Sequence, residues 1–445
     1  MSAPGSAPGS ARGLIVAAAA SGSGKTTLTL ALLRLLARSG AKVASAQVGP
    51  DYIDPAFHAA ASRRSCLNLD PWAMRPETLA ATVTLLEEDA DLIVCEGAMG
   101  LFDGIGADGV GSTADLAALT GWPVILVLDV GGQSATAAAV LAGLARYRPE
   151  VRVAGAILNR VGSPAHAETI VEACRKTVPD VAMLGWVRRS ADLARPERHL
   201  GLVQAREQAD LESFLDRAAE TVEAALDIPA MIALTTSAKL APAKMATTVP
   251  PPGQRIALAD DLAFAFAYPG MLVGWARAGA EILPFSPLAD EAPDAAADAV
   301  FLPGGYPELH AGRLAANQAW KRGLAEAAAR GAAIYGECGG YMALGQGLVD
   351  AEGARHAMAG LLPVETSFAG RKLHLGYREI AASAATPLGP AGTRYRGHEF
   401  HYASETGAAG DPLFQASDAR GHDLGAVGCR NGSVFGSFLH LIDRR

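Results

Sequence analysis

Short apolar runs alternate with longer amphipathic stretches through the first half of the chain. Ala- and Leu-rich segments of helical character separate these runs, and the first such segment, 26–38, ends at Ser39-Gly40. This alternation predicts an α/β fold in which helices cover both faces of a parallel sheet. Ligands of such folds bind at the carboxyl ends of the strands. The predicted strands are 13–20, 43–47, 92–95, 124–129 and 153–159.

The pattern breaks once, around residues 235–253. Small residues, two lysines and the run Pro250-Pro251-Pro252 replace the alternation there, and a second α/β alternation begins at Arg255. A chain of 445 residues exceeds the usual size of a single core. We therefore predict a disordered tail (1–12), a first α/β domain (13–234), a linker (235–253) and a second α/β domain (254–445).

Composition narrows the possible partners. The net charge of −8 argues against general affinity for nucleic acid, which needs clustered Lys and Arg. The apolar run 14–20 is too short to span a bilayer and leads into a glycine loop, so we interpret it as a strand and not as a signal peptide. Five scattered cysteines without a C-x-x-C spacing indicate free thiols in a reducing compartment. We expect a cytoplasmic protein, a homodimer, with no nucleic-acid or membrane partner.

A glycine-rich loop, Ala19-Ala20-Ser21-Gly22-Ser23-Gly24-Lys25-Thr26-Thr27, joins the first predicted strand to the first helix. This is the context that a phosphate-binding loop requires. Backbone N–H groups would surround a phosphate chain, Lys25 would neutralise it, and Thr26 would offer a hydroxyl to Mg²⁺. Because Ala19 replaces the first glycine of the usual Walker pattern, a plain helix-starting turn is the alternative. The predicted ATP-binding residues are Gly22, Ser23, Gly24, Lys25, Thr26 and Thr27.

Two acidic segments follow the next strands, at 49–55 and 95–104. Both fall at the edge of the sheet where ligands bind. Mg²⁺ prefers a few carboxylates together with phosphate oxygens and water. Asp next to Gly or Pro is also ordinary turn chemistry, which is the alternative for each single residue. We predict metal ligands at Thr26, Asp54 and Glu96, and residues facing a second substrate at Asp51, Tyr52 and Asp103.

The second half carries a cysteine, Cys338, on a predicted strand-to-helix turn rich in glycine. A cysteine in that place is exposed to substrate and activated by the helix N-terminus. Its base must come from elsewhere in the chain, and His440 follows a short apolar run near the C-terminus. Backbone N–H groups of Gly305, in a Pro-Gly-Gly turn, and of Gly339 are predicted to hold an oxyanion. Together these residues predict a glutaminase.

The remaining cysteines lack such a setting and are predicted to be structural. His398 and His401, in Gly-His-Glu-Phe-His, resemble a metal-binding pair. No third ligand has convincing spacing, so we favour a structural or substrate-pocket role for them.

Seven segments resemble the cobyrinic acid a,c-diamide synthase family, which includes the enzymes for hydrogenobyrinic acid. The resemblance spans nearly the whole chain after the first dozen residues. It rests on Ser-Gly-Ser-Gly-Lys-Thr, Gly-Pro-Asp-Tyr-Ile-Asp-Pro, Glu-Gly-x-Met-Gly-Leu-Phe-Asp-Gly, Pro-Gly-Gly-Tyr-Pro-Glu, Tyr-Gly-Glu-Cys-Gly-Gly-Tyr-Met, Arg371-Lys372-Leu373-His374-Leu375-Gly376-Tyr377 and Gly-Ser-Phe-Leu-His-Leu-Ile-Asp.

This resemblance implies a P-loop domain similar to dethiobiotin synthetase, followed by a class I glutamine amidotransferase domain. It implies amidation of the a and c acetate side chains of a corrinoid tetrapyrrole, with ATP and L-glutamine as co-substrates and Mg²⁺ as cofactor. Cys338 would be the nucleophile and His440 its base.

Two positions depart from what the resemblance implies. Class I amidotransferases usually place a glutamate two residues after the histidine, where this chain has Ile442. The family branch also lacks it, so we expect a Cys–His dyad. Gln47 stands where a lysine is expected before Gly-Pro-Asp.

Alternative functions remain within and outside the enzyme class. One is amidation of another tetrapyrrole, such as nickel-sirohydrochlorin, or of a nucleotide base. A partitioning-type ATPase would carry an extra lysine at the position of Ser21 and no Cys/His half. A glutaminase subunit with an inactive N-terminal half would not bind ATP.

Overall fold

The computed structural model describes residues 11–190, 193, 204–244, 247–407 and 410–445. The described residues form two compact units. The first contains the chain up to 72 and from 76 to 244, and the second contains 73–75 and the chain from 247 onward. Each unit has an α/β fold with a sheet of its own, as the alternating pattern predicts.

The first unit follows the predicted strand–helix alternation. Its elements are β1 (Arg12–Ala18), α1 (Lys25–Arg38), β2 (Val43–Val48), α2 (Asp54–Ser62), β3 (Cys66–Leu69), α3 (Pro76–Glu87), β4 (Leu92–Glu96), α4 (Thr113–Thr120), β5 (Val124–Asp129), α5 (Thr136–Arg146), β6 (Val153–Val161), α6 (Pro164–Thr177), β7 (Ala182–Arg188), the 3-10 turn η3 (Ala205–Glu207), α7 (Leu211–Ala225), α8 (Ile228–Leu234) and β8 (Thr236–Ser237). The strand order is β3-β2-β4-β1-β5-β6-β7, and all these neighbours are parallel.

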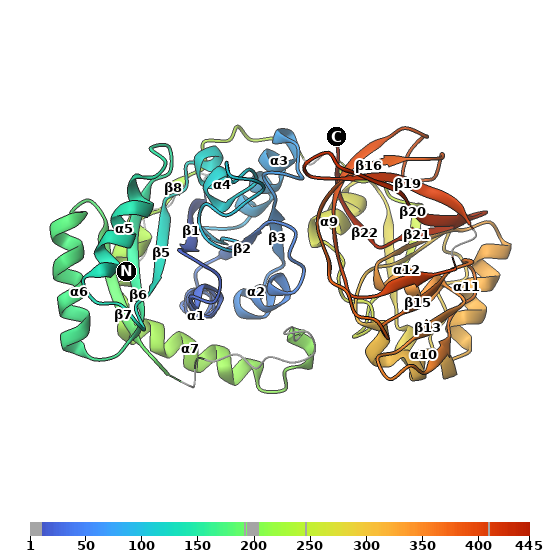
Figure 1. The fold of residues 1–445 in the computed structure, drawn as a ribbon, viewed down its shortest axis with the longest axis horizontal. Helices are drawn as coiled ribbons and strands as arrows, with labels where there is room; N and C mark the ends of the chain where they lie inside the picture. Colours follow the sequence, from blue (N-terminus) through green and yellow to red (C-terminus); the bar gives the residue numbers. More distant parts are fainter. Residues whose placement is uncertain (1–10, 191–192, 194–203, 245–246, 408–409) are drawn as a thin grey trace. The chain divides into compact units, whose positions relative to one another are not determined.

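Helices cover both faces of this sheet, as Figure 1 shows, with α1, α2 and α7 on one face and α3, α4 and α5 on the other. The strands are therefore buried on both sides, which explains their continuous apolar runs. Leu28, Leu32 and Leu36 of α1 are buried. Arg34 on the same helix is buried as well, and its guanidinium pairs with Glu212 at 2.6 Å and Asp216 at 2.7 Å on α7. These ion pairs compensate the buried charge and connect α7 to α1.

The second unit combines parallel and antiparallel pairing. Its elements are β9 (Arg255–Ala259), α9 (Pro269–Arg277), β10 (Glu281–Phe285), η4 (Pro287–Ala289), β11 (Ala299–Leu302), η5 (Pro307–His310), α10 (Ala311–Ala316), α11 (Ala319–Ala329), β12 (Ala333–Glu337), α12 (Gly339–Leu344), β13 (Gly347–Val349), β14 (Arg355–Ala357), β15 (Glu365–Ser367), β16 (His374–Ala382), β17 (Arg394–His401), β18 (Ser404–Thr406), β19 (Asp411–Asp418), β20 (Asp423–Asn431), β21 (Val434–Ser437) and β22 (Leu439–Arg444). The main sheet has the order β10-β9-β11-β12-β21-β20-β19-β16-β17-β22, and β13, β14, β15 and β18 form a small second sheet.

Aromatic side chains fix the centre of this sheet. The rings of Phe301, Tyr335 and Phe435 stack across β11, β12 and β21, with centroid distances of 5.4 and 5.2 Å. All three are fully or almost fully buried, and Trp320 of α11 is buried as well. Stacked cross-strand aromatic pairs stabilise a sheet beyond the area they bury. They therefore hold the ends of β11, β12 and β21 in place, and the Pro-Gly-Gly turn, Cys338 and His440 follow these ends.

Part of the predicted N-terminal tail and part of the predicted linker form β-strands. Residues 1–10 of the predicted tail lie outside the described residues, but Arg12 begins β1. The pairing of β5 with β1 begins at Ile15, so β5 offers no backbone partner to Arg12 and Gly13 on its side of β1. Thr236–Ser237, at the start of the predicted linker, fills this side as an antiparallel strand and satisfies the open groups. Among the described residues, no helix is both long and apolar enough to cross a bilayer.

Candidate functional site

The predicted phosphate loop lies between β1 and α1. Gly22 and Gly24 have φ of 76° and 84°, in the left-handed region that favours glycine. Gly24 has no room for a side chain, because a Cβ there would lie 2.2 Å from the Asn159 amide nitrogen. The helix therefore begins at Lys25 with its first N–H groups at the carboxyl edge of the sheet, which is the arrangement that binds phosphate.

Two residues at the end of β6 hold the loop, and the sequence analysis missed both. Asn159 donates from its amide nitrogen to the Ser23 carbonyl oxygen at 2.8 Å, and Arg160 donates to the Gly22 carbonyl oxygen at 2.8 Å. In the sequence, the only indication of this role was the position of the two residues at the end of a predicted strand. These bonds orient the loop carbonyls away from the anion site and leave its N–H groups for a ligand.

The three predicted metal ligands lie together. The Thr26 hydroxyl lies 2.5 Å from Glu96 Oε1 and 3.3 Å from Asp54 Oδ2, and Lys25 Nζ lies 3.5 Å from Glu96 Oε1. They come from α1, α2 and the end of β4, three segments far apart in the sequence. The arrangement offers one hydroxyl and two carboxylates beside the phosphate loop. These are hard oxygen ligands of the kind that Mg²⁺ prefers.

His58, which the sequence analysis also missed, fixes Glu96. Its Nε2 lies 2.8 Å from Glu96 Oε2, and both side chains are buried. Burial by itself would raise the pKa of Glu96, but the hydrogen bond to His58 and the charge of Lys25 outweigh it and lower the pKa to about 2. Glu96 is thus held as a carboxylate. His58 follows Asp54 by four residues, one turn along α2. This spacing was the feature of the sequence that could have placed His58 near the predicted metal ligands.

The predicted substrate residues Asp51 and Tyr52 lie in the turn before α2. Asp51 Oδ1 accepts hydrogen bonds from the backbone nitrogens of Ile53 at 2.7 Å and Asp54 at 3.2 Å. These bonds are those of a turn-forming residue, the alternative for Asp51, and its role toward a substrate stays a prediction. Burial, with the nearby charges of Asp54 and Glu96, raises the pKa of Asp51 to about 7. Tyr52 is buried, and its role toward a substrate stays a prediction.

Asp103 lies on the loop after β4. Its Oδ2 accepts from the Gly100 nitrogen at 2.8 Å, and Gly100 packs against the Ala19 carbonyl of the phosphate loop. Asp103 is exposed and lines a cavity of about 660 Å³ together with Met99, Phe102 and Tyr147. The position next to the phosphate loop suits a residue that faces the second substrate, and that role stays a prediction.

In the second unit, Cys338 lies between β12 and α12. Its φ of 47° and ψ of −104° place a non-glycine residue in a strained conformation at the N-terminus of the helix. Strain of this kind is concentrated at functional sites, and a tight strand-to-helix turn is typical of nucleophiles. Burial, with the nearby charge of Glu308, raises the pKa of the Cys338 thiol well above its usual value, although the Gly339 N–H opposes this shift. Cys338 therefore needs a base to become a thiolate.

The fold brings His440 to Cys338 and Gly305 to Gly339. A Cβ on Gly304 would lie 2.5 Å from His440 Cε1 and 3.4 Å from Cys338 Cβ, so both residues border Gly304. A Cβ on Gly339 would lie 2.9 Å from the Gly305 nitrogen. The two predicted oxyanion donors thus come from adjacent backbone segments beside the nucleophile.

Gly340 is a sensitive position in this turn, because a Cβ there would lie 1.9 Å from the Leu302 carbonyl oxygen. We expect Gly340→Ala to destabilise the second unit by about 1–3 kcal/mol, since backbone must move to admit the methyl group. Urea unfolding checks this. Gly270→Ala on α9 is the matched control, because a Cβ there meets no atom within 4 Å. Equal stability of the two variants would contradict this account of the turn.

A carboxylate also faces His440, whereas the sequence predicts a dyad. His440 Nδ1 lies 3.5 Å from Glu337 Oε2, and both side chains are buried. Ile442, at the position where a glutamate is usual, is buried. Glu337 directly precedes the nucleophile, so the sequence shows that it belongs to the cysteine motif. The sequence does not show that its side chain points toward His440.

His398 and His401, which resemble a metal-binding pair in the sequence, do not meet at one site. The two residues are three positions apart on β17, so their side chains point to opposite faces of the sheet. His398 lies opposite His440 in the antiparallel pairing of β17 with β22. Burial, together with the charges of His440 and Arg378, lowers the pKa of His398 to about 3, so its ring is neutral.

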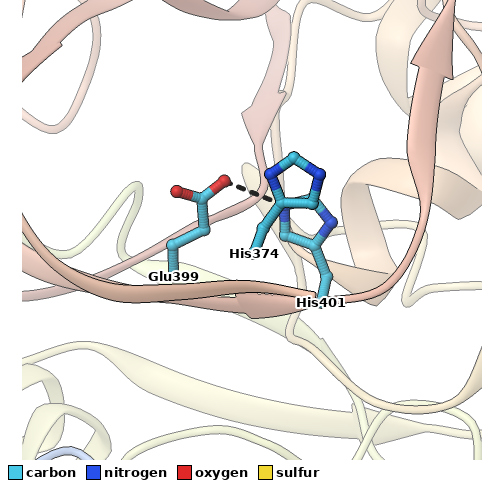
Figure 2. Close-up of side chains that lie close together, drawn as sticks. All are labelled: His374, Glu399 and His401. Atoms are coloured by element: carbon cyan, nitrogen blue, oxygen red, sulfur yellow. Dashed lines mark hydrogen bonds and ion pairs between the residues drawn. The ribbon is translucent and has the colours of Figure 1, made fainter. Parts of the chain in front are cut away.

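His401 instead lies with Glu399 and His374, as Figure 2 shows. Its Nε2 lies 2.8 Å from Glu399 Oε1 and its Nδ1 lies 2.9 Å from the Ala403 carbonyl oxygen. The rings of His374 and His401 are parallel within 2°, with centroids 4.6 Å apart. Lone pairs in two parallel ring planes do not converge on one ion. This geometry favours the structural or substrate-pocket role over a metal pair.

Comparisons with known proteins match both units. Residues 14–203 match the CobQ/CobB/MinD/ParA nucleotide binding domain family, and 255–445 match the CobB/CobQ-like glutamine amidotransferase domain family. The hydrogenobyrinate a,c-diamide synthase of Mesorhizobium japonicum is 52% identical over 98% of this chain and 99% of its own length. Proteins of the same name from Rhizobium meliloti and Brucella abortus are 52% and 53% identical, each over 97% of this chain and 99% and 98% of their own lengths.

Proposed function

The chain belongs to the hydrogenobyrinate a,c-diamide synthase family, and on this premise we propose that it is an ATP- and glutamine-dependent ligase of cobalamin biosynthesis. Its substrate is hydrogenobyrinic or cobyrinic acid, and the reaction converts the a and c acetate carboxylates to amides. One observation supports this most directly. One unit carries a phosphate loop with clustered carboxylates, and the other carries a strained cysteine beside a histidine.

The first unit makes the substrate carboxylate reactive. A carboxylate is a poor electrophile, so transfer of the γ-phosphoryl group of ATP converts it to an acyl phosphate and releases ADP. The N–H groups at the start of α1 and the Lys25 ammonium stabilise the charge of the moving phosphoryl group.

Mg²⁺ fits the donor set of the first unit. Thr26, Asp54 and Glu96 would hold it, because they offer three hard oxygens beside the phosphate loop and Glu96 is kept ionised. A bound Mg²⁺ supplies positive charge that neutralises the phosphate oxygens. The Thr26 hydroxyl is oriented for this by its contacts with both carboxylates.

The second unit releases ammonia from glutamine. Cys338 attacks the side-chain amide carbon, its proton passes to His440, and the Gly305 and Gly339 N–H groups bind the resulting oxyanion. His440 returns the proton to the leaving nitrogen, ammonia departs, and water hydrolyses the thioester to glutamate. Ammonia then displaces phosphate from the acyl phosphate and forms the amide. Because water competes for that acyl phosphate, ammonia must be shielded until it reacts.

Mass spectrometry of the product tests the proposal. We expect hydrogenobyrinic or cobyrinic acid, incubated with ATP, Mg²⁺ and glutamine, to undergo two successive acid-to-amide mass shifts, each with release of one ADP and one glutamate. Nickel-sirohydrochlorin serves as the competing tetrapyrrole. Amidation of that compound alone would show that the substrate assignment is wrong, and absence of any ADP release would show that the first unit is not a synthetase.

A cytoplasmic location is part of the same proposal. All five cysteines are free thiols in the structure, as expected in a reducing compartment. Both ATP and glutamine are available in that compartment.

A further inference from the structure

Glu337 is the last residue of β12 and directly precedes the nucleophile. Its side chain is fully buried in the second unit. A buried carboxylate is costly unless it is paired and hydrogen-bonded, so its partners indicate why it is there. None of the steps proposed above uses this residue.

One oxygen of Glu337 is held in a fixed position. Oε1 accepts from the Tyr335 hydroxyl at 2.7 Å and from the Leu441 backbone nitrogen at 3.2 Å. Tyr335 lies two positions earlier on β12, on the same face of the strand, and its ring is stacked between Phe301 and Phe435. The carboxylate plane is thus set by two donors that cannot easily move.

The other oxygen faces the catalytic histidine. Oε2 accepts no hydrogen bond among the described residues and lies 3.5 Å from His440 Nδ1. An unsatisfied buried carboxylate oxygen costs free energy, which a donated imidazole N–H would recover. Hydrogen bonds of catalytic groups are often long in the free enzyme and shorten in the reacting complex.

We infer that Glu337 is the positioning residue of the glutaminase, and that it orients His440 through Nδ1 as the third member of a Cys338–His440–Glu337 triad. The inference rests on the proposed glutaminase function of this unit. Glu337 replaces the carboxylate that related amidotransferases carry two residues after the histidine, where this chain has Ile442. It reaches His440 from β12 because β12 pairs with β21, and His440 is the second residue of β22, the next strand along the chain.

The triad gives a balanced proton transfer. With Nδ1–H directed at Glu337, His440 presents the lone pair of Nε2 and accepts the Cys338 proton as the S–C bond to glutamine forms. The imidazolium then lies beside the carboxylate, which stabilises its charge. The proton moves only between Cys338, His440 and the leaving nitrogen, and it leaves with ammonia.

Glu337→Gln tests this role, because it retains the size of the side chain and removes the negative charge. We expect the kcat of glutamine hydrolysis to fall by about 10²–10⁴-fold. The KM for glutamine should change little, since Glu337 does not contact substrate. Amidation with ammonium chloride should stay within about twofold of the unaltered protein, which shows that the synthetase and the fold are intact.

Three further variants separate orientation from packing. Glu337→Asp keeps the charge, so it should retain more glutaminase than Glu337→Gln and the pH profile of the parent. Tyr335→Phe removes one of the two donors to Oε1 and leaves the Leu441 nitrogen, so it should give a smaller loss of kcat. Glu326→Gln, an exposed carboxylate on α11 of the same unit, is the matched control and should have parental activity.

The outcomes are distinct. Equal losses in Glu337→Gln and Glu337→Asp would overturn the inference in favour of a packing role, and so would parental glutaminase in Glu337→Gln. Absence of glutamine-dependent amidation in the unaltered protein would instead overturn the proposed function itself.

Discussion

Cys338→Ala is expected to abolish glutamine-dependent amidation, by at least about 10³-fold, while ammonium-dependent amidation continues. The reason is that the sulfur forms the thioester through which ammonia is released, whereas the acyl phosphate is made in the other unit. Glutamate and ADP release, measured separately with glutamine and with ammonium chloride, check the prediction.

Cys429→Ala provides the control for Cys338→Ala. Cys429 is also a buried thiol of the second unit, but it lies beside the Tyr341 hydroxyl and not beside His440. It should keep glutamine-dependent turnover. Loss of both glutamine- and ammonium-dependent amidation in Cys338→Ala would mean that the cysteine has a role outside ammonia release.

Lys25→Ala is expected to show the reverse separation: ADP release falls by at least about 10²-fold, while glutamine hydrolysis persists. The Lys25 ammonium is the positive charge in the phosphate loop, and its removal leaves the γ-phosphoryl oxygens without that stabilisation. Glu96 keeps its contacts with Thr26 and His58, so the first unit should remain folded. Coupled assays of ADP and glutamate in the same samples measure the two activities.

Lys42→Ala is the matched control for Lys25→Ala. Lys42 lies in the same unit with its side chain exposed and paired with Asp89, away from the loop. It should retain full ADP release. ADP release at the parental rate in Lys25→Ala would show that the loop does not bind the reacting phosphate.

Features formed by consecutive residues followed from the sequence. The run at 124–129 forms β5 with the predicted bounds, and β9 begins at Arg255, where the second alternation is predicted to begin. The helix predicted at 26–38 begins one residue earlier. The phosphate loop belongs to the same class, since strand, glycine turn and helix are contiguous. Apolar periodicity and glycine conformation are local properties, and they decide such elements without knowledge of the rest of the fold.

The sequence also predicted that Cys338 and His440 belong to one site, because the type and setting of both residues indicated nucleophilic chemistry, and in the structure both border Gly304. Their motifs, together with the family resemblance, led to the function supported by the relatives. It did not determine which way neighbouring side chains point. His398 and His401 belong to the same short motif but lie on opposite faces of β17.

Partners that meet through the order of strands were decided by the tertiary structure alone. Glu96 reaches Thr26 because β4 inserts between β1 and β2, and no local pattern records that insertion. Asn159 supports the phosphate loop from β6, and Glu337 faces His440 from β12. A single buried polar residue leaves no periodic signal, and its function depends on a contact with a residue distant in the chain. Such contacts exist only once the sheets have formed.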